Sequence, residues 1–116
     1  MSTPNFWEIL DKFSEESRLI IEINRGTNPV NPEAKFPVDY GYLEGTSSSD
    51  GEGIDVFIGT DPDRRVDAIL CTADLLKRDS EIKILIGCTE KEKMDVSRFY
   101  ETYLSMRGIL IRRSNS

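Results

Sequence analysis

The chain has 116 residues, of which 31% are charged, and its formal net charge at pH 7 is −6, with no histidine. An acidic chain of this length fits one globular domain, and it argues against a general nucleic-acid binder, which needs a basic surface to neutralise phosphates. The absence of histidine removes the usual zinc ligand and the usual general base, so any chemistry must use carboxylates, amines, phenols and metal-activated water.

The first half of the chain predicts one helix and three strands. In PNFWEILDKFSEES (4–17), apolar residues recur every three or four positions, which is typical of a short amphipathic helix. RLIIEIN (18–24) is short and rich in Leu and Ile, which favours a strand, and the cluster of Gly, Asn and Pro that follows predicts a loop. An extended piece in FPVDYGYLEG (36–45), the loop TSSSDGEG (46–53) and the strand IDVFIG (54–59) come next.

The second half predicts two further strands and a helix. VDAILCT (66–72) and EIKILIGC (81–88) are apolar runs of strand length, whereas apolar residues between Glu90 and about Met106 recur at helical spacing. GILIRR (108–113) is compatible with a final edge strand. The order of elements indicates a mainly β member of the α+β class, with a small curled sheet or barrel, a short N-terminal helix and one long C-terminal helix.

The cysteines and the hydropathy pattern indicate the cellular compartment of the protein. Cys71 and Cys88 lie in apolar segments at a spacing that matches no zinc motif, and we interpret them as reduced core residues. No apolar stretch reaches the length of a signal or membrane segment, so we expect a cytoplasmic protein without a membrane partner.

Acidic residues stand at the mouths of several predicted strands. DGEGID (50–55) is compatible with a solvated turn, but Glu22, Asp74 and Glu81 repeat the feature in other strands. A closed sheet would bring these positions around one cavity. Clustered carboxylates repel one another unless cations are present, and magnesium, with its preference for oxygen ligands, is the favoured cation. This pattern predicts metal-assisted phosphoryl chemistry.

The same residues resemble a known family. FPVDYGYLEGTSSSDGEGIDVFIG looks like the central segment of the soluble family I inorganic pyrophosphatases, with its Tyr-Gly pair followed by spaced acids. RLIIEINRGTNPVNPE and DAILCTADLLKRDSEIKILIG resemble other segments of that family. The resemblance covers roughly residues 18–110. It implies one pyrophosphatase-like domain over 1–116, a five-stranded OB-like barrel with flanking helices, and hydrolysis of inorganic diphosphate to two phosphates by metal-activated water.

The resemblance also implies roles for particular residues. Asp55 would bridge the metals, and Asp50 and Tyr40 would join it in catalysis. Lys83 and Tyr103 would contact the phosphates of the substrate. The implied cofactor is Mg²⁺, with Mn²⁺ as the alternative, and the implied metal ligands are Asp50, Glu52, Asp55, Asp74, Glu81, Glu22 and Glu33.

The chain departs from the family pattern in two ways. Glu52 and Glu81 replace aspartates, and Gly53 replaces a proline. Asn31 and Leu104 stand where the family has lysines, and a segment that carries an arginine is missing between Glu33 and Lys35. Replacement cations could come from Arg25, Lys35, Arg64, Arg65 or Arg107.

These departures leave alternatives to diphosphate hydrolysis. The substrate could be another phosphoanhydride or a phosphate ester, or the chain could be a retired enzyme that serves as a metal-binding, phosphate-binding or assembly module. Aromatic residues on the first helix also favour a homo-oligomer.

Overall fold

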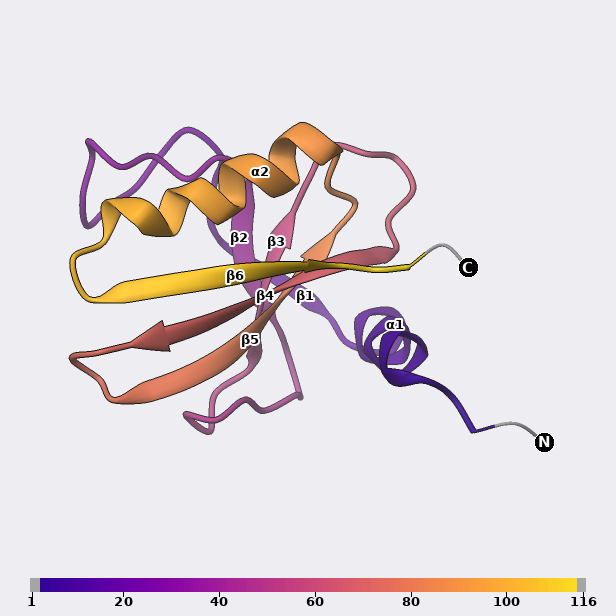
Figure 1. Ribbon diagram of the computed structural model, residues 1–116. Helices are drawn as coiled ribbons and strands as arrows, with labels where there is room; N and C mark the ends of the chain where they lie inside the picture. Colours follow the sequence, from indigo (N-terminus) through magenta and orange to yellow (C-terminus); the bar gives the residue numbers. More distant parts are fainter. Residues whose placement is uncertain (1–2, 115–116) are drawn as a thin grey trace.

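A computed structural model describes residues 3–114 and consists of one sheet with a helix on each face (Figure 1). The sheet has six strands in the order β1-β2-β3-β5-β4-β6, so that β1 and β6 form its edges. Neighbouring strands are antiparallel except β3 and β5, which are parallel. The elements are α1 (Phe6–Glu16), β1 (Leu19–Ile23), β2 (Asp39–Leu43), β3 (Ile54–Ile58), β4 (Val66–Asp74), β5 (Asp79–Ile86), α2 (Glu90–Phe99), the 3₁₀ turn η1 (Tyr100–Thr102) and β6 (Met106–Arg112).

Both helices begin with a capping box. Asn5 and Glu8 exchange side-chain and backbone hydrogen bonds at the start of α1, and Thr89 and Glu92 do the same at the start of α2. The second helix is shorter than the sequence predicts, because it ends at Phe99 and continues only as η1. The hydroxyl of Thr102 donates to the Phe99 carbonyl oxygen at 2.7 Å, and a hydrogen bond of this kind competes with regular helix.

The two faces of the sheet bury separate apolar clusters. The face under α2, called the inner face, packs Phe57, Leu70 and Leu85 against Val96 and Phe99. The opposite face carries a second cluster, which includes Leu10 of α1 and is formed mainly by Val and Ile of β3, β4 and β5. A central sheet buried on both faces explains why these strands are nearly continuous apolar runs in the sequence.

The predicted class is confirmed: the protein is mainly β and has an OB-like fold with two helices. The final edge strand expected at GILIRR is present as β6, which pairs with β4 from Met106 to Arg112. The structure therefore has one six-stranded open sheet in place of the expected five-stranded barrel. Within residues 3–114, neither helix has the length and apolar character needed to span a membrane.

Candidate active site

The inner face changes from apolar to polar at one end of the sheet. Moving along β3 and β5 on this face, Phe57 gives way to Asp55, and Leu85 gives way to Lys83 and then Glu81. Side chains on one face of a strand are two residues apart, so these polar groups continue the same rows as the buried core. They form a cavity of about 400 Å³, which we call the acidic cleft. Its lining residues are Glu22, Ile23, Asn28, Val30, Phe36, Tyr40, Asp50, Glu52, Asp55, Thr72, Lys77, Asp79, Glu81, Lys83, Tyr100, Tyr103 and Met106.

Lys83 is the centre of the cleft. Its ammonium group donates to Asp55 Oδ2 at 2.7 Å and to Glu81 Oε2 at 3.3 Å, with a weaker contact to the Tyr40 hydroxyl at 3.5 Å. Only 5% of Lys83 is exposed, so the ammonium group depends on these partners for the hydrogen bonds that water would otherwise supply. The structure thus brings Asp55, Glu81, Lys83 and Tyr40 together at one place.

Burial controls the protonation of two of these groups. It raises the pKa of Glu81, and the nearby Lys83 ammonium only partly opposes that rise. Burial, followed by the negative charge of Asp55, raises the pKa of the Tyr40 hydroxyl far above its ordinary value. Tyr40 therefore stays protonated at any physiological pH and can donate a hydrogen bond.

Asp50 and Glu52 reach the cleft from the loop between β2 and β3. Asp50 Oδ1 accepts from the Ser48 hydroxyl at 2.8 Å and from the Glu52 backbone N–H at 2.9 Å, and these bonds, the backbone bond first, lower the pKa of Asp50. At the end of this loop, the backbone of Gly53 packs against the Tyr42 ring, and an added Cβ would lie 2.6 Å from Tyr42 Cδ2. Packing against this ring therefore favours glycine at position 53.

Glu22 and Tyr103 also line the cleft, from β1 and from the end of η1. The register between β1 and β2 shifts between Ile21 and Ile23, and this irregularity explains how the consecutive residues Glu22 and Ile23 both face the cleft. Tyr103 is half-buried and packs on Phe99 with a centroid distance of 5.5 Å.

Two of the sequence-predicted metal ligands are not brought to the cleft. The Asp74 carboxylate accepts the backbone N–H groups of Leu76 and Lys77 at 2.9 and 3.1 Å, so it shapes the turn between β4 and β5. Glu33 is exposed on the loop between β1 and β2 and is not among the lining residues. None of the five candidate replacement cations named above lines the cleft either.

Sequence reasoning missed Asp79, Lys77 and Thr72. Asp79 is at the start of β5, and the alternation of Asp79, Glu81 and Lys83 at every second position was the signal that places all three on one face. Thr72 is paired with Glu81 across the β4–β5 ladder. No pattern in the sequence marks Lys77, which belongs to the turn.

A second polar hollow, called the distal cavity, lies at the other end of β4. Its lining residues are Asp61, Asp63, Arg65, Asp67, Cys88, Thr89, Glu90, Lys93, Arg112 and Arg113. The four acids are matched by four cations. Arg112 Nε donates to Glu90 at 2.8 Å, and Asp67 Oδ2 accepts the Cys88 backbone N–H at 3.0 Å. Burial raises the pKa of Asp67.

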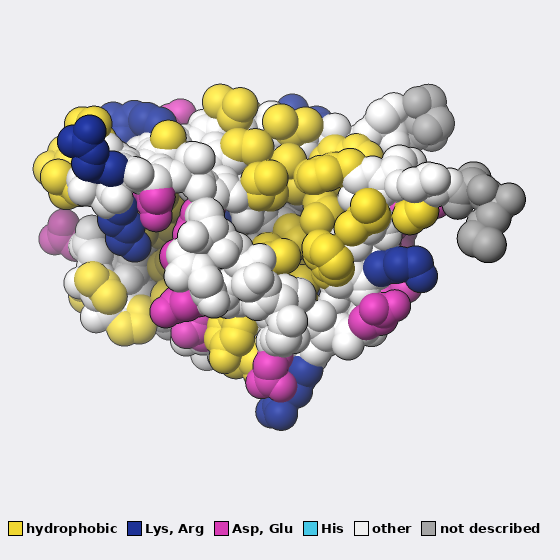
Figure 2. All heavy atoms as spheres, turned by 90° about the horizontal axis from the view of Figure 1, so that it is seen from below, with side chains coloured by type: hydrophobic (Ala, Val, Ile, Leu, Met, Phe, Trp, Pro, Cys, Tyr) yellow, Lys and Arg dark blue, Asp and Glu magenta, His cyan; other side chains and the backbone are white. Residues whose placement is uncertain are grey.

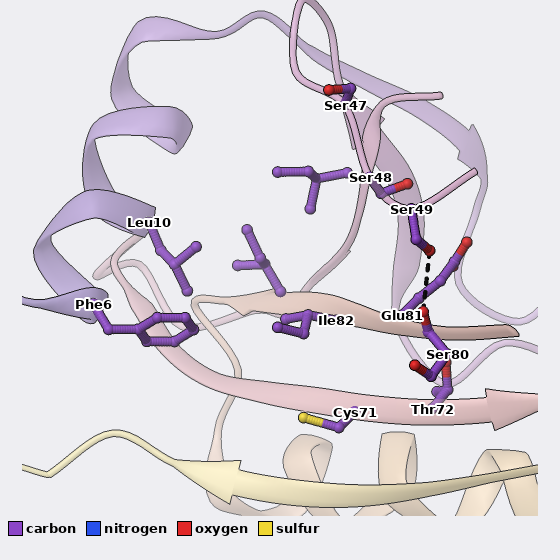
Figure 3. A pocket seen from close by; sticks show the side chains of 12 residues that line it. Phe6, Leu10, Ser47, Ser48, Ser49, Cys71, Thr72, Ser80, Glu81 and Ile82 are labelled. Carbon is purple, nitrogen blue, oxygen red and sulfur yellow. Dashed lines mark hydrogen bonds between the residues drawn. The ribbon is translucent and has the colours of Figure 1, made fainter. Parts of the chain in front are cut away.

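A third hollow is apolar and lies on the face opposite α2 (Figure 2). Phe6 and Leu10 of α1 point toward Ile82 across it, and Cys71 lies at its base (Figure 3). The loop that carries Asp50 is tied to β5 at its edge, where the Ser49 hydroxyl donates to the Ser80 carbonyl oxygen at 3.0 Å. Glu81 is the single acid in its lining, so this hollow does not have the chemistry of a metal or phosphate site.

Solved structures of inorganic pyrophosphatases share this fold. The enzyme from Thermus thermophilus has a TM-score of 0.60 and 17% identity, with 82% of this chain and 81% of that chain covered. The enzyme from Coxiella burnetii has a TM-score of 0.62 and 18% identity, with 81% and 84% covered. The enzyme from Helicobacter pylori has a TM-score of 0.60 and 15% identity, with 81% of each chain covered.

The sequence itself carries the family signature. The family model described as Inorganic Pyrophosphatase matches residues 22–108, which include all of the acidic cleft. The chain therefore belongs to the inorganic pyrophosphatase family. A search of curated proteins gives no match.

Proposed function

We propose that the acidic cleft hydrolyses a phosphoanhydride with the help of a divalent cation, with inorganic diphosphate as the reference substrate. The observation that carries this proposal is the buried Lys83 ammonium group held between Asp55 and Glu81 at one end of the inner face. Six carboxylates and two ammonium groups line the cleft, so an anion enters it only together with cations.

The donor chemistry of the cleft fits magnesium. This ion is usually held by one or two carboxylates together with water and substrate phosphates, rather than by a cage of protein ligands. Among the described residues no three acids or cysteines converge to hold a metal ion by themselves, so a bound ion would need further ligands from water and the phosphate. Asp55 and Glu81, with Asp50 and Glu52 from the loop, are the residues that would hold it. Magnesium, when bound, supplies positive charge at phosphate oxygens and Lewis acidity.

The chain's own residues bind the substrate and handle the proton. Lys83 donates to a phosphate oxygen in place of a carboxylate, and the protonated Tyr40 hydroxyl donates beside it. Asp55 accepts the proton of the attacking water. Tyr103, at the edge of the cleft, contacts the phosphate that is farther from Asp55.

Phosphate release from diphosphate in the presence of magnesium tests the proposal. We expect Asp55→Asn to lower the rate at least about 100-fold, because it removes a carboxylate that acts in the reaction. Asp63→Asn is the matched control, since Asp63 is an exposed acid of the distal cavity. Circular dichroism and urea unfolding of both variants separate loss of chemistry from loss of folding.

Each outcome of that test has a distinct reading. Equal rates for the wild type and Asp55→Asn would overturn the catalytic role of Asp55. Magnesium binding by calorimetry, without release from any phosphoanhydride, would favour a retired enzyme that still binds metal. Neither binding nor release would favour an assembly module.

We also infer that the protein forms a homo-oligomer in which the apolar face opposite α2 contacts the same face of a second copy of the chain. Phe6, Ile82 and Ile109 are 46%, 43% and 64% exposed, and β6 presents an open edge. Such edges pair readily with another strand, and a symmetric pair of copies buries the same patch twice. Light scattering should give at least twice the mass of one chain, with a lower mass for Ile109→Glu. A single-chain mass for the wild type would overturn this inference.

A further inference from the structure

The acidic cleft is poor in cations of its own. Among the lining residues only Lys77 and Lys83 are basic, and Lys83 is already engaged by two carboxylates. The guanidinium group of Arg107 is turned away to the backbone oxygens of Tyr103 and Met106. The protein thus has few cationic side chains that could bind the oxygens of the phosphate farther from Lys83 in a bare diphosphate.

The same cleft has an apolar rim instead. Ile23, Val30, Tyr103 and Met106 line it with exposed or half-buried side chains, and they come from β1, the loop before β2, the end of η1 and the start of β6. Phe36 also lines the cleft but is only 6% exposed, so it adds little accessible surface. Val30 is 91% exposed. A bare diphosphate has no apolar atoms to bury against these side chains, whereas an organic group would remove them from water.

The size of the cleft allows for such a group. Its volume of about 400 Å³ falls in the range of pockets that hold drug-sized organic ligands, and these are usually lined by apolar and aromatic side chains with a few polar groups. Five of the six acids come from β3, β5 and the loop before β3, and only Glu22, in β1, shares an element with an apolar rim residue. The charged and apolar parts of the lining therefore belong largely to different elements.

We propose that the preferred substrate is a diphosphate monoester, whose inner phosphate carries an apolar organic group that packs on this rim. This proposal rests on the proposed hydrolysis of a phosphoanhydride. The water oxygen bonds to the terminal phosphorus, and the bond from that phosphorus to the bridging oxygen breaks with its electron pair on the bridging oxygen. One water proton passes to Asp55 and then to solvent. The products are inorganic phosphate and an organic monophosphate, whose phosphate oxygen is the former bridging oxygen.

The test compares phosphate release, with magnesium, from inorganic diphosphate, methyl diphosphate, hexyl diphosphate and adenosine diphosphate. Methyl diphosphate has the charge of the organic substrates but almost none of their apolar surface. We expect kcat/KM for hexyl or adenosine diphosphate to exceed that for methyl and inorganic diphosphate at least about tenfold, as apolar contacts of this size allow. Preference between the hexyl and adenosine compounds tells whether the group is aliphatic or aromatic.

Variants locate the preference on the rim. Val30→Ser should lower the ratio of kcat/KM for hexyl diphosphate to that for methyl diphosphate about threefold or more, because it removes an exposed apolar contact without disturbing the core. Leu76→Ser is the matched control, since Leu76 is 81% exposed on the β4–β5 turn and is not part of the cleft lining. Its ratio should equal that of the wild type.

The outcomes separate this inference from the proposed function. Faster hydrolysis of inorganic diphosphate than of every monoester would overturn the inference and leave the proposed function standing. Equal rates for methyl, hexyl and adenosine diphosphate would overturn the role of the apolar rim. No phosphate from any of the four compounds would overturn both.

Discussion

The acidic cleft and the distal cavity lie at opposite ends of β4, and both are polar hollows, but their charges are arranged differently. In the distal cavity four acids face four cations, and pairs such as Arg112 with Glu90 lie within hydrogen-bond distance. In the cleft six acids face two cations. Charges that balance within the chain serve the fold, whereas an excess of acids that the chain itself does not balance is costly unless a ligand supplies cations.

The largest expected effect comes from breaking the centre of the cleft. Lys83→Met leaves Asp55 and Glu81 without their shared ammonium group, so we expect turnover to be lost and the free energy of unfolding to fall by about 2 to 3 kcal/mol. Urea unfolding at pH 7 measures this change. Because burial already raises the pKa of Glu81, the deficit should shrink as the pH falls and Glu81 takes up a proton.

Lys83→Arg is the control for that experiment, since it keeps the positive charge. It should retain most of the stability and lose turnover, because a planar guanidinium group cannot take the position of the ammonium group. A Lys83→Met variant that is as stable as the wild type at pH 7 would contradict the view that the ion pair holds the cleft together.

An intermediate effect is expected beside the distal cavity, at the start of α2. Buried Glu92 accepts from the Thr60 hydroxyl at 2.9 Å and from the Thr89 backbone N–H at 2.9 Å. We expect Glu92→Ala to lower the free energy of unfolding by about 2 kcal/mol, since it removes hydrogen bonds to a charged group. Turnover per folded molecule should not change, whereas Lys83→Met should lose both stability and turnover.

The pH dependence of Glu92 follows from its pKa. Burial raises that pKa, but the hydrogen bonds from Thr89 and Thr60 outweigh burial and lower it overall. A carboxyl group whose pKa is lower in the folded chain stabilises it above the unfolded pKa, and this contribution is lost as the pH falls through the folded pKa. The stability difference between the wild type and Glu92→Gln should therefore shrink in acid; a constant difference down to pH 2 would contradict it.

The smallest effect is expected for the exposed pair at the rim of the distal cavity. Arg112 and Glu90 have side chains that are 46% and 62% exposed, and such pairs contribute little because water and salt screen them. Arg112→Gln should leave the urea midpoint within experimental error at 0.5 M salt. A clear loss of stability there would show that the distal cavity depends on each of its pairs.

The sequence predicted the strands more reliably than the ends of the elements. The apolar runs at 18–24 and 54–59 each contain a strand of the structure, and those at 66–72 and 81–88 each overlap one that extends further at one end. The C-terminal helix begins at Glu90 as predicted, but its end was placed too late, because Phe99, Tyr100 and Tyr103 recur at a spacing that fits both a helix and an aromatic cluster. The cluster, joined by η1, is what the structure contains.

The position of a polar residue in the site could be predicted where the sequence around that residue allows a single interpretation. Asp55 and Lys83 interrupt apolar strands, so their polar side chains required an explanation, and the structure places them 2.7 Å apart. Asp74 has the same appearance in the sequence, but its carboxylate is satisfied by two backbone N–H groups in a turn. An acid after a strand can form a turn or a site, and only its partners distinguish the two. The single-domain organisation and the cytoplasmic location stay predictions.

The sequence by itself determined the family, the mainly β class and the position of the central acids, because these depend on local order along the chain: periodicity, the Tyr-Gly pair and the spacing of Asp50 and Asp55. The tertiary structure decided which charged groups share the cleft. Strand register brings Asp55 beside Lys83, the irregularity in β1 turns Glu22 inward, and the turn withdraws Asp74. Contacts between distant segments depend on pairing and packing, which no local pattern encodes.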